Sequence, residues 1–282
     1  MENPASPRKL AGRYEVRQIL GQGGMGLVYR AYDTVVRREV AVKTILDIPD
    51  PASLQLFYKE CDVLASMSHP NIVEIFDIGE FEEDGKKKPY FVMPLLPGTT
   101  LEYFIRKASH RLTVERTIDI MSQTCRGLQA AHERGLVHRY VNPSNILLTD
   151  SAPGRRRILL AGLGVARRPD ETNSLTRANL GIGTVSYAAP EQLMDDSIDG
   201  QADQYALACT AFHLLTGWPP FAHMNPAVVI SKHLNEAPPR PSDMNPELIY
   251  FDAPFARALM KAPAERFPQC REFAKALRRG AT

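Results

Sequence analysis

The pattern of apolar and polar residues changes character near residue 94. Between Tyr14 and about Val92, short runs rich in β-branched and aromatic residues lie between turns, and such runs predict strands. They cover residues 14–20, 27–32, 38–45, 72–78 and 90–93. Residues 52–67 differ, because their apolar side chains recur at spacings of three and four, which predicts an amphipathic helix.

Beyond Pro94 the helical spacing dominates. It predicts helices over residues 100–107, 113–134, 200–216 and 268–278, with short strands at 145–148 and 157–160. We therefore predict an α+β fold with a strand-rich lobe over 11–94 and a mostly helical lobe over 97–277. The breaker-rich segment 94–98 would be the hinge, and a cleft between lobes is the default place for a ligand. Residues 1–10 are expected to be a disordered extension.

Composition and charge narrow the class of protein. The 282 residues are 44% apolar and 23% charged, as in ordinary globular proteins, and 34 Lys and Arg against 32 Asp and Glu give no reason to expect nucleic acid or an anionic membrane as a partner. The basic triplets 86–88 and 155–157 are interpreted as solvated turns, with an acidic partner as the less favoured alternative.

Cysteine spacing and hydropathy bear on the compartment. The four cysteines lie far apart, which favours neither a zinc site nor a disulfide framework and fits a reducing compartment. No run of about 18 apolar residues and no signal peptide are apparent, so we expect a soluble, cytoplasmic domain without direct membrane contact.

A glycine-rich segment is the first sign of chemistry. Gly21, Gly23 and Gly26 form a Gly-x-Gly-x-x-Gly pattern between two predicted strands, where missing side chains let backbone amides approach phosphate oxygens. A plain hairpin would have the same pattern, so this signal alone is weak. A dinucleotide-binding fold is disfavoured because a strand, rather than a helix, follows.

A lysine and a glutamate strengthen the phosphate hypothesis. Lys43 ends the strand-like Val-Ala-Val-Lys run, and Glu60 lies on the predicted helix, where a carboxylate could orient that lysine. An isolated strand lysine is usually a solvated edge residue. The order of loop, lysine and helical glutamate indicates a nucleotide pocket.

With these elements the chain resembles the bacterial serine/threonine protein kinases of the eukaryotic (Hanks) type, over roughly residues 11–277. Residues 138–145, His-Arg-Tyr-Val-Asn-Pro-Ser-Asn, resemble the catalytic loop of that family, and residues 189–191, Ala-Pro-Glu, resemble the motif that closes its activation segment. Asp203 looks like the helix residue that anchors the loop, and Arg266 like the arginine that pairs with Glu191.

The resemblance implies a two-lobed kinase-like fold and an adenine nucleotide site. Met93 would be the gatekeeper, the carbonyl of Pro94 and the amide of Leu96 would face the adenine, and Asn145 would face a metal. The full set of implied nucleotide-site residues is Leu20, Gly21, Gly23, Gly26, Val28, Ala41, Lys43, Glu60, Met93, Pro94, Leu96, Asn145 and Leu147.

Three departures fall on the chemistry. Tyr140 stands where the family has its catalytic aspartate, and a phenol is neutral at pH 7. Asn142 replaces the lysine that contacts the transferring phosphate, which removes a positive charge. Gly162 replaces the metal-binding aspartate and offers no ligand, so no metal site is expected. Asn145 alone would hold Mg²⁺ poorly, because Mg²⁺ prefers carboxylates and phosphates.

These departures predict a catalytically impaired kinase-like domain, a pseudokinase rather than an enzyme, without catalytic residues. It would bind ATP weakly or without Mg²⁺ and act as a regulatory or scaffolding module. One alternative is a slow or unconventional ATP-dependent serine/threonine kinase. Another is a protein-interaction module with an empty nucleotide cleft.

Partners and regulation follow from the resemblance as expectations. The partners would be other signalling proteins, including an active kinase that phosphorylates segment 165–188, which contains Ser174, Thr176, Thr184 and Ser186. Leu64, Ile75, His138 and Leu163 would stack as the family's regulatory spine. Because the chain ends just past the last helix of the family, it is expected to be part of a longer protein.

Overall fold

The computed structural model describes residues 8–23, 26–45, 51–83, 85–107, 111–152, 155–162, 185–194 and 196–281. The described residues form two compact units. One contains the chain up to Ser68 together with Val73–Leu96, and the other contains His69–Ile72 and the described chain from Pro97 onward. An antiparallel sheet forms the first unit and helices dominate the second, so the predicted α+β architecture is confirmed.

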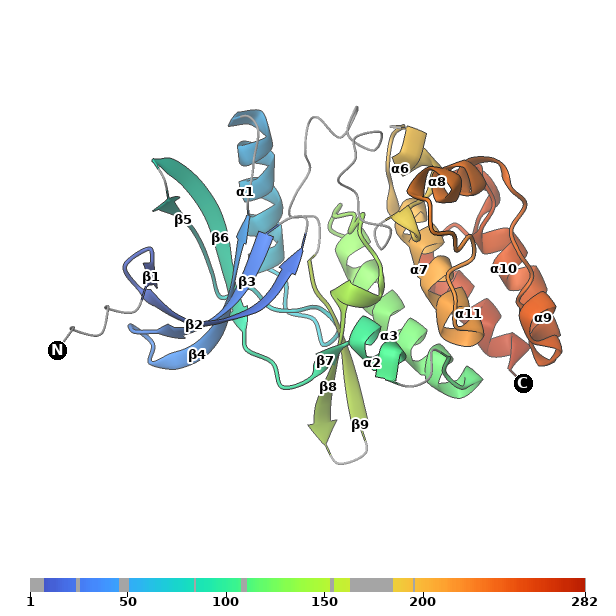
Figure 1. Ribbon diagram of the computed structural model, residues 1–282, viewed down its shortest axis with the longest axis horizontal. Helices are drawn as coiled ribbons and strands as arrows, with labels where there is room; N and C mark the ends of the chain where they lie inside the picture. Colours follow the sequence, from blue (N-terminus) through green and yellow to red (C-terminus); the bar gives the residue numbers. More distant parts are fainter. Residues whose placement is uncertain are drawn as a thin grey trace. The chain divides into compact units, whose positions relative to one another are not determined.

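The first unit is built on one antiparallel sheet of order β1-β2-β3-β4-β6-β5 (Figure 1). Its strands are β1 (Lys9–Leu10), β2 (Tyr14–Gly23), β3 (Gly26–Asp33), β4 (Arg38–Ile45), β5 (Asp77–Glu83) and β6 (Lys86–Pro94). Alternate side chains of these strands point to opposite faces. Tyr29, Val40 and Val42 therefore lie on one face, where they pack in a buried cluster with Tyr14 and Tyr90.

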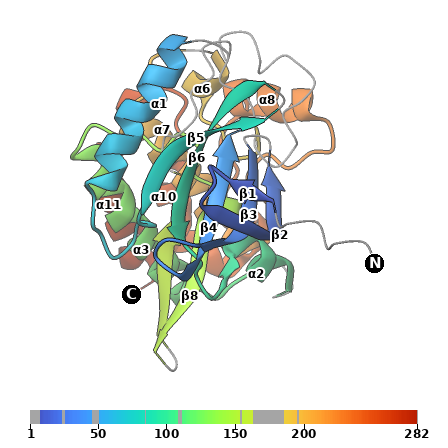
Figure 2. The ribbon, with the colours of Figure 1, turned by 90° about the vertical axis from the view of Figure 1, so that its left-hand side faces the viewer.

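Helix α1 (Pro51–Ala65) accompanies this sheet (Figure 2). Phe57, Cys61 and Leu64 are buried, as spacings of three and four on an amphipathic helix require. The Tyr58 hydroxyl donates to Glu80 Oε1 on β5 at 2.6 Å, which ties the helix to the sheet edge. The predicted helix over 52–67 is thus confirmed to within two residues.

The second unit is organised around α7 (Gly200–Thr216), which is buried along nearly its whole length. Asp199 caps its start by accepting from the backbone N–H of Gln201, and Gly217, with φ of 90°, ends it in the left-handed region that favours glycine. Helices α3 (Val114–His132), α10 (Asp252–Ala258) and α11 (Cys270–Gly280) contact α7 (Figure 1).

Smaller elements complete the second unit. A three-stranded sheet of order β7-β8-β9 consists of β7 (Thr99–Thr100), β8 (Ile146–Ala152) and β9 (Arg155–Leu160). The remaining helices are α2 (Leu101–Lys107), α6 (Pro190–Met194), α8 (Pro226–Asn235) and α9 (Pro241–Met244), with the 3₁₀ turns η1 (Pro143–Asn145), η2 (Pro246–Phe251) and η3 (Pro263–Glu265). No described helix is long and apolar enough to span a membrane.

Two predictions about where elements begin need correction. The strand predicted over 72–78 begins only at Asp77. Ile72 instead forms an isolated parallel bridge with Leu160 of β9, and the Leu160 N–H donates to the Asn71 carbonyl. Ile72 therefore belongs to the second unit, whereas Val73 and the residues after it belong to the first. The disordered extension predicted over 1–10 is wrong for Lys9 and Leu10, which pair with β2 as strand β1, and residues 1–7 lie outside the described residues.

Candidate active site

In the first unit, strand pairing gathers the predicted nucleotide residues on one face of the sheet. Val28 lies opposite Lys43, Lys43 lies opposite Phe91, and Ala41 lies opposite Met93. Residues directly opposite in an antiparallel pair share a face, as do residues two apart on a strand. All five side chains therefore lie on the face away from the cluster that contains Val40 and Val42.

The glycine-rich segment joins β2 and β3. Gly21 pairs with Val28, Gly23 pairs with Gly26, and Leu20 next to them is exposed. Gly26 has φ of 154°, and a Cβ there would lie 1.7 Å from the carbonyl oxygen of Thr44. Only glycine fits this close approach of two backbones. At Gly21, by contrast, a Cβ would have nothing within 4 Å.

Lys43 places a cation on this face. Its side chain is half-buried, and its ammonium lies 5.7 Å from the centre of the Phe91 ring. Burial lowers the pKa of the Lys43 amine. Because burial penalises the charged amine, an anionic ligand would be stabilised here. Glu60 is half-buried on α1, Met93 and Pro94 end β6, and half-buried Leu96 follows that strand.

In the second unit, the segment that resembles a catalytic loop is held by Asp203 from α7. The carboxylate of Asp203 accepts the backbone N–H of His138 at 2.8 Å and that of Arg139 at 2.7 Å. The same carboxylate lies 2.7 Å from His132 Nε2 on α3. Asp203 is fully buried. The predicted anchoring role of Asp203 is confirmed.

The His138 ring is fixed by two backbone contacts. The Tyr140 N–H donates to His138 Nδ1 at 3.2 Å, so Nδ1 accepts, and Nε2 donates to the Ala161 carbonyl at 3.0 Å. These roles describe the neutral ring with its proton on Nε2. Arg139 next to it has φ of 68°, a left-handed conformation that is unusual outside glycine. Loop geometry is therefore imposed from several sides.

Asn142 caps the 3₁₀ turn η1. Its Oδ1 accepts from the Ser144 N–H at 2.9 Å, the Ser144 hydroxyl at 2.6 Å and the Asn145 N–H at 3.2 Å. A short polar side chain with an extended backbone is the usual N-cap arrangement. Asn142 thus stabilises the loop, in the position where the resembled family has a lysine.

Asn145 and Gly162 lie next to each other. The Asn145 amide donates to the Tyr140 carbonyl at 2.7 Å, and the backbone carbonyl of Asn145 accepts from the Ala161 N–H at 2.9 Å. A Cβ on Gly162 would lie 3.3 Å from Asn145 Oδ1. The amide oxygen of Asn145 is therefore directed toward the position where the family carries its metal-binding carboxylate.

Leu147 lies close by in sequence on β8. It is half-buried, whereas its neighbours Ile146 and Leu148 are buried, so it faces the opposite side of the small sheet. Among the described residues, no group of three or more His, Cys, Asp or Glu side chains could hold a metal ion.

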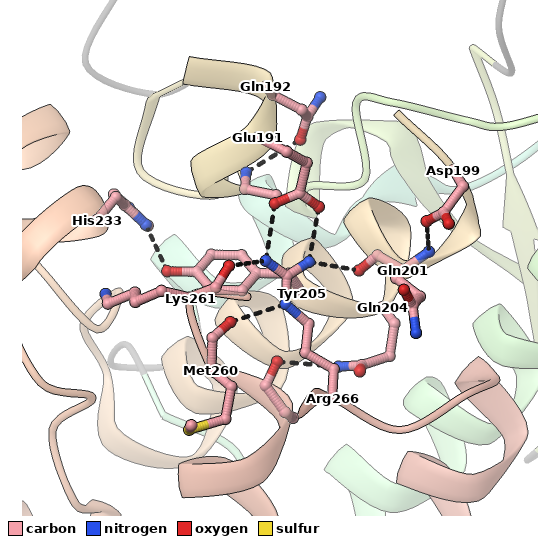
Figure 3. Close-up of polar contacts among 12 residues, drawn as sticks. Glu191, Gln192, Asp199, Gln201, Gln204, Tyr205, His233, Met260, Lys261 and Arg266 are labelled. Carbon is pink, nitrogen blue, oxygen red and sulfur yellow. Dashed lines mark hydrogen bonds and ion pairs between the residues drawn. The ribbon is translucent and has the colours of Figure 1, made fainter. Parts of the chain in front are cut away.

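In the second unit, a buried ion pair joins Glu191 of α6 to Arg266 (Figure 3). Arg266 donates to both carboxylate oxygens of Glu191, at 2.6 and 2.7 Å. Its other N–H groups donate to backbone carbonyls of Met260, Gln201 and Lys261. All five donors of the guanidinium are thus used, and the predicted pairing with Glu191 is confirmed.

One contributor was not anticipated from the sequence. Gln192 donates from its amide to the Arg139 carbonyl at 2.7 Å and accepts from the Ala189 N–H at 3.0 Å. It therefore couples α6 to the loop. The position of Gln192 directly after Glu191 was the one feature of the sequence that could have indicated this role. It was not enough, because a glutamine on a short helix can hydrogen-bond to many other groups.

Several predictions lie outside the described residues. Leu163 of the proposed spine does, as do Ser174, Thr176 and Thr184. Of the predicted phosphorylation sites only Ser186 is described, and it is buried. Leu64 is buried and Ile75 half-buried in the first unit, and His138 is buried in the second.

The chain is similar in sequence to protein kinases. A family model described as the protein kinase domain matches residues 14–275. The chain is 46% identical over 270 residues to serine/threonine-protein kinase PknF of Mycobacterium tuberculosis, covering 95% of this chain and 56% of the relative. It is 35% identical over 274 residues to serine/threonine-protein kinase PknB of Mycolicibacterium smegmatis, covering 95% and 43%.

A solved structure confirms the predicted two-lobed protein-kinase fold. The crystal structure of the PknI kinase domain of Mycobacterium tuberculosis aligns with a TM-score of 0.76 and 35% identity, over 99% of this chain and 100% of that one. The chain spans about half the length of the curated relatives it matches. The prediction that the chain is not an enzyme is contradicted, because these relatives are named as kinases.

Proposed function

The chain belongs to the protein kinase family, and on this premise we propose that it is an ATP-dependent serine/threonine protein kinase domain with an unconventional, slow catalytic loop. The observation that carries the proposal is the assembled loop. Asp203 holds the backbone of His138 and Arg139, and His138 binds the Ala161 carbonyl, although Tyr140 replaces the aspartate.

ATP is the proposed nucleotide. In the first unit, Lys43 would bind phosphate, and Val28, Ala41 and Met93 on the same sheet face would contact the base. Gly26, which tolerates no side chain, keeps the glycine-rich segment close to β4. In the second unit Leu147 offers a half-buried apolar side chain. These residue types fit a nucleotide.

Magnesium fits the described residues less well. Asn145 Oδ1 is one neutral oxygen, and Gly162 has no side chain to add a carboxylate. Mg²⁺ prefers near-octahedral oxygen coordination and usually keeps several waters and substrate phosphates. We therefore propose that ATP binding depends only weakly on Mg²⁺ and that any metal arrives with the phosphates.

The expected rate follows from what is missing. A general base contributes roughly 10²–10⁴-fold, and kinases turn over at roughly 1–100 s⁻¹, so loss of the aspartate alone predicts roughly 10⁻² s⁻¹. Asn142 supplies no positive charge, because its side chain is a neutral amide, and its oxygen is engaged in capping η1. This loss lowers the expected rate further, though such effects are not additive.

A regulatory or scaffolding role alongside slow transfer is the second candidate. It is favoured by the side chains of Asn142 and Asn145, which are occupied in stabilising the loop. In this reading, nucleotide binding controls partner signalling proteins. We also propose, as part of this regulatory role, that the domain is cytoplasmic and that another kinase phosphorylates segment 165–188.

Calorimetric titration of ATP, with and without Mg²⁺, tests the nucleotide proposal. We expect Lys43→Met to weaken the affinity for ATP at least tenfold, because methionine keeps the side-chain volume of lysine and removes its positive charge. Lys59→Met is the matched control, since Lys59 is an exposed lysine on α1 of the same unit. Equal binding by wild type and Lys43→Met would refute the site.

Phosphoryl transfer from γ-labelled ATP to a serine- and threonine-containing peptide pool tests the reaction. Slow labelling that disappears in Lys43→Met supports the kinase. ATP binding without labelling above the Lys43→Met background would overturn the transferase proposal.

A further inference from the structure

Two arginines from distant parts of the second unit meet on one aromatic ring. The guanidinium carbons of Arg116, in the first turn of α3, and Arg156, on β9, each lie 4.6 Å from the centre of the Phe104 ring on α2. The two charges can therefore be separated by no more than twice that distance. Packing of α2 against β8 and of α3 against β9 fixes the meeting point.

This convergence of like charges is unfavourable in the free protein. Partial burial first, and the charge of Arg156 second, lower the pKa of the Arg116 guanidinium. The start of α3 adds a partial positive charge, because the N–H groups of a first helical turn point along the helix axis out of its N-terminal end, although Thr113 Oγ1 accepts the N–H of Arg116. Three positive sources thus lie together, and an anion would relieve their repulsion.

Neighbouring carboxylates leave this charge largely uncompensated. Glu102 pairs with Arg106 at 3.0 Å, and Asp119 accepts from the Gln123 amide at 3.0 Å. Exposed Asp150 reaches Arg156 only at 4.0 Å. Glu115 lies in the same first turn as Arg116 and is the one nearby carboxylate that offsets part of its charge among the described contacts. Within the described part of the chain, Arg116 takes part in no ion pair.

The ring also fixes how the charges are presented. A guanidinium stacked on an aromatic face keeps its N–H edge free for hydrogen bonds. Arg156 stays 41% exposed at its side chain, and Arg116 is exposed as well. Both donor edges are therefore accessible from solvent.

We propose that Arg116 and Arg156, held on Phe104, bind a phosphorylated serine or threonine on a partner protein. A phosphomonoester carries nearly two negative charges and three acceptor oxygens, and so can be shared by two forked donors. A single carboxylate carries one charge and two oxygens. This site is separate from the catalytic loop and does not depend on the proposed transferase activity.

The test measures binding of a fluorescein-labelled nonapeptide with a central phosphothreonine flanked by glutamates, at low ionic strength. Its unphosphorylated twin is the ligand control. We expect the phosphopeptide to bind at least tenfold more tightly than its twin, and Arg116→Ala and Arg156→Ala each to weaken it about tenfold. In the double variant the loss should fall short of the product, because both arginines bind one phosphate.

The protein control is Arg240→Ala, which removes the same charge from an exposed arginine at the start of α9. It should leave affinity unchanged within twofold. Arg156→Lys keeps the charge but not the fork, and should still weaken binding.

Four outcomes would overturn the proposal. They are no binding of the phosphopeptide, equal binding of both peptides, an equal loss in Arg240→Ala, and tighter binding of single-stranded RNA at the same two arginines. The last would assign the site to nucleic acid. Thermal unfolding of each variant establishes that the loss is not caused by misfolding.

Discussion

The amide oxygen of Asn145 faces the Cα of Gly162, and a Cβ built on that glycine would lie 3.3 Å from the oxygen. A hydrogen bond from the side-chain amide N–H of Asn145 to the Tyr140 carbonyl holds this orientation. In the metal site proposed above, the second unit thus offers the neutral oxygen of Asn145 and lacks a carboxylate beside it. This relationship explains why Mg²⁺ dependence is the informative property of the site.

Gly162→Asp is expected to restore metal dependence. The new carboxylate would lie beside Asn145 Oδ1, so ATP should bind about tenfold more tightly with Mg²⁺ than without it. Gly162 has φ of 75°, a region that Asp and Asn tolerate better than other side chains. Calorimetric titration of ATP with and without Mg²⁺ measures the effect.

Gly162→Asn is the matched control for that experiment. It has the same shape and the same backbone strain but no charge. If Gly162→Asn and Gly162→Asp gave the same Mg²⁺ dependence, the carboxylate would not be the missing group.

The cap formed by Asn142 predicts that restoring the family's lysine has a cost in stability. Asn142→Lys removes the acceptor for the Ser144 and Asn145 N–H groups, which should lower the free energy of unfolding by about 1 kcal/mol. Thermal or denaturant unfolding measures this loss. Asn142→Asp keeps an acceptor and should stay within about 0.5 kcal/mol of wild type. An Asn142→Lys variant as stable as wild type would contradict the capping role.

The sequence allowed the residues of the loop to be identified, because Tyr140 and Asn142 lie within a few positions of His138. Asp203 and the Glu191–Arg266 pair were also recognised, since family motifs surround each of them. What could not be predicted depends on contacts between distant segments. The pairing of Ile72 with Leu160 removed part of a predicted strand from the first sheet, although its local pattern favoured a strand.

The same limit applies to the arginines on Phe104. Residues 155–157 were interpreted as a solvated turn. Arg156 and Arg157 are exposed, but the turn is wrong, because all three residues pair with β8 as the start of strand β9. The meeting of Arg156 with Arg116 requires that α2, α3 and β9 pack together, and no local pattern encodes this. Charge clusters of this kind become visible only after the fold is known.

Removing one partner of the buried pair of Glu191 and Arg266 is expected to destabilise the second unit strongly. Arg266→Met leaves Glu191 charged and buried without its partner, which should lower the free energy of unfolding by about 3–5 kcal/mol. Replacing both by Glu191→Leu and Arg266→Met should recover a large part of this loss, because no unpaired charge remains. Urea denaturation followed by circular dichroism measures both.

Arg257→Met is the control for this measurement, since Arg257 is exposed and stacks on Phe267 without a buried ion pair among the described contacts. It should cost less than about 1 kcal/mol. A single Arg266→Met variant no less stable than Arg257→Met would show that the pair contributes little.

In the first unit, Asp33 predicts a specific acid sensitivity. Arg13 donates to both of its oxygens, at 2.8 and 2.7 Å, and the N–H groups of Val35 and Val36 add two more hydrogen bonds. The hydrogen bond from Arg13 is the main cause that lowers the pKa of Asp33 from its ordinary value of 3.8 to about 2.

The sign of the effect follows from that direction. Because the folded-state pKa lies below the unfolded one, this carboxylate stabilises the fold above pH 4, and its contribution is lost as pH falls from about 4 toward 2. The contribution at neutral pH is roughly 2 kcal/mol. The difference in unfolding free energy between wild type and Asp33→Asn should therefore narrow across that range.

Glu39→Gln is the control, because Glu39 forms an exposed pair with Arg30. Its unfolding free energy should differ little from that of wild type, and the difference should hardly change with pH. A constant difference between wild type and Asp33→Asn from pH 6 to pH 2.5 would mean that Asp33 stabilises the fold by shape rather than by charge.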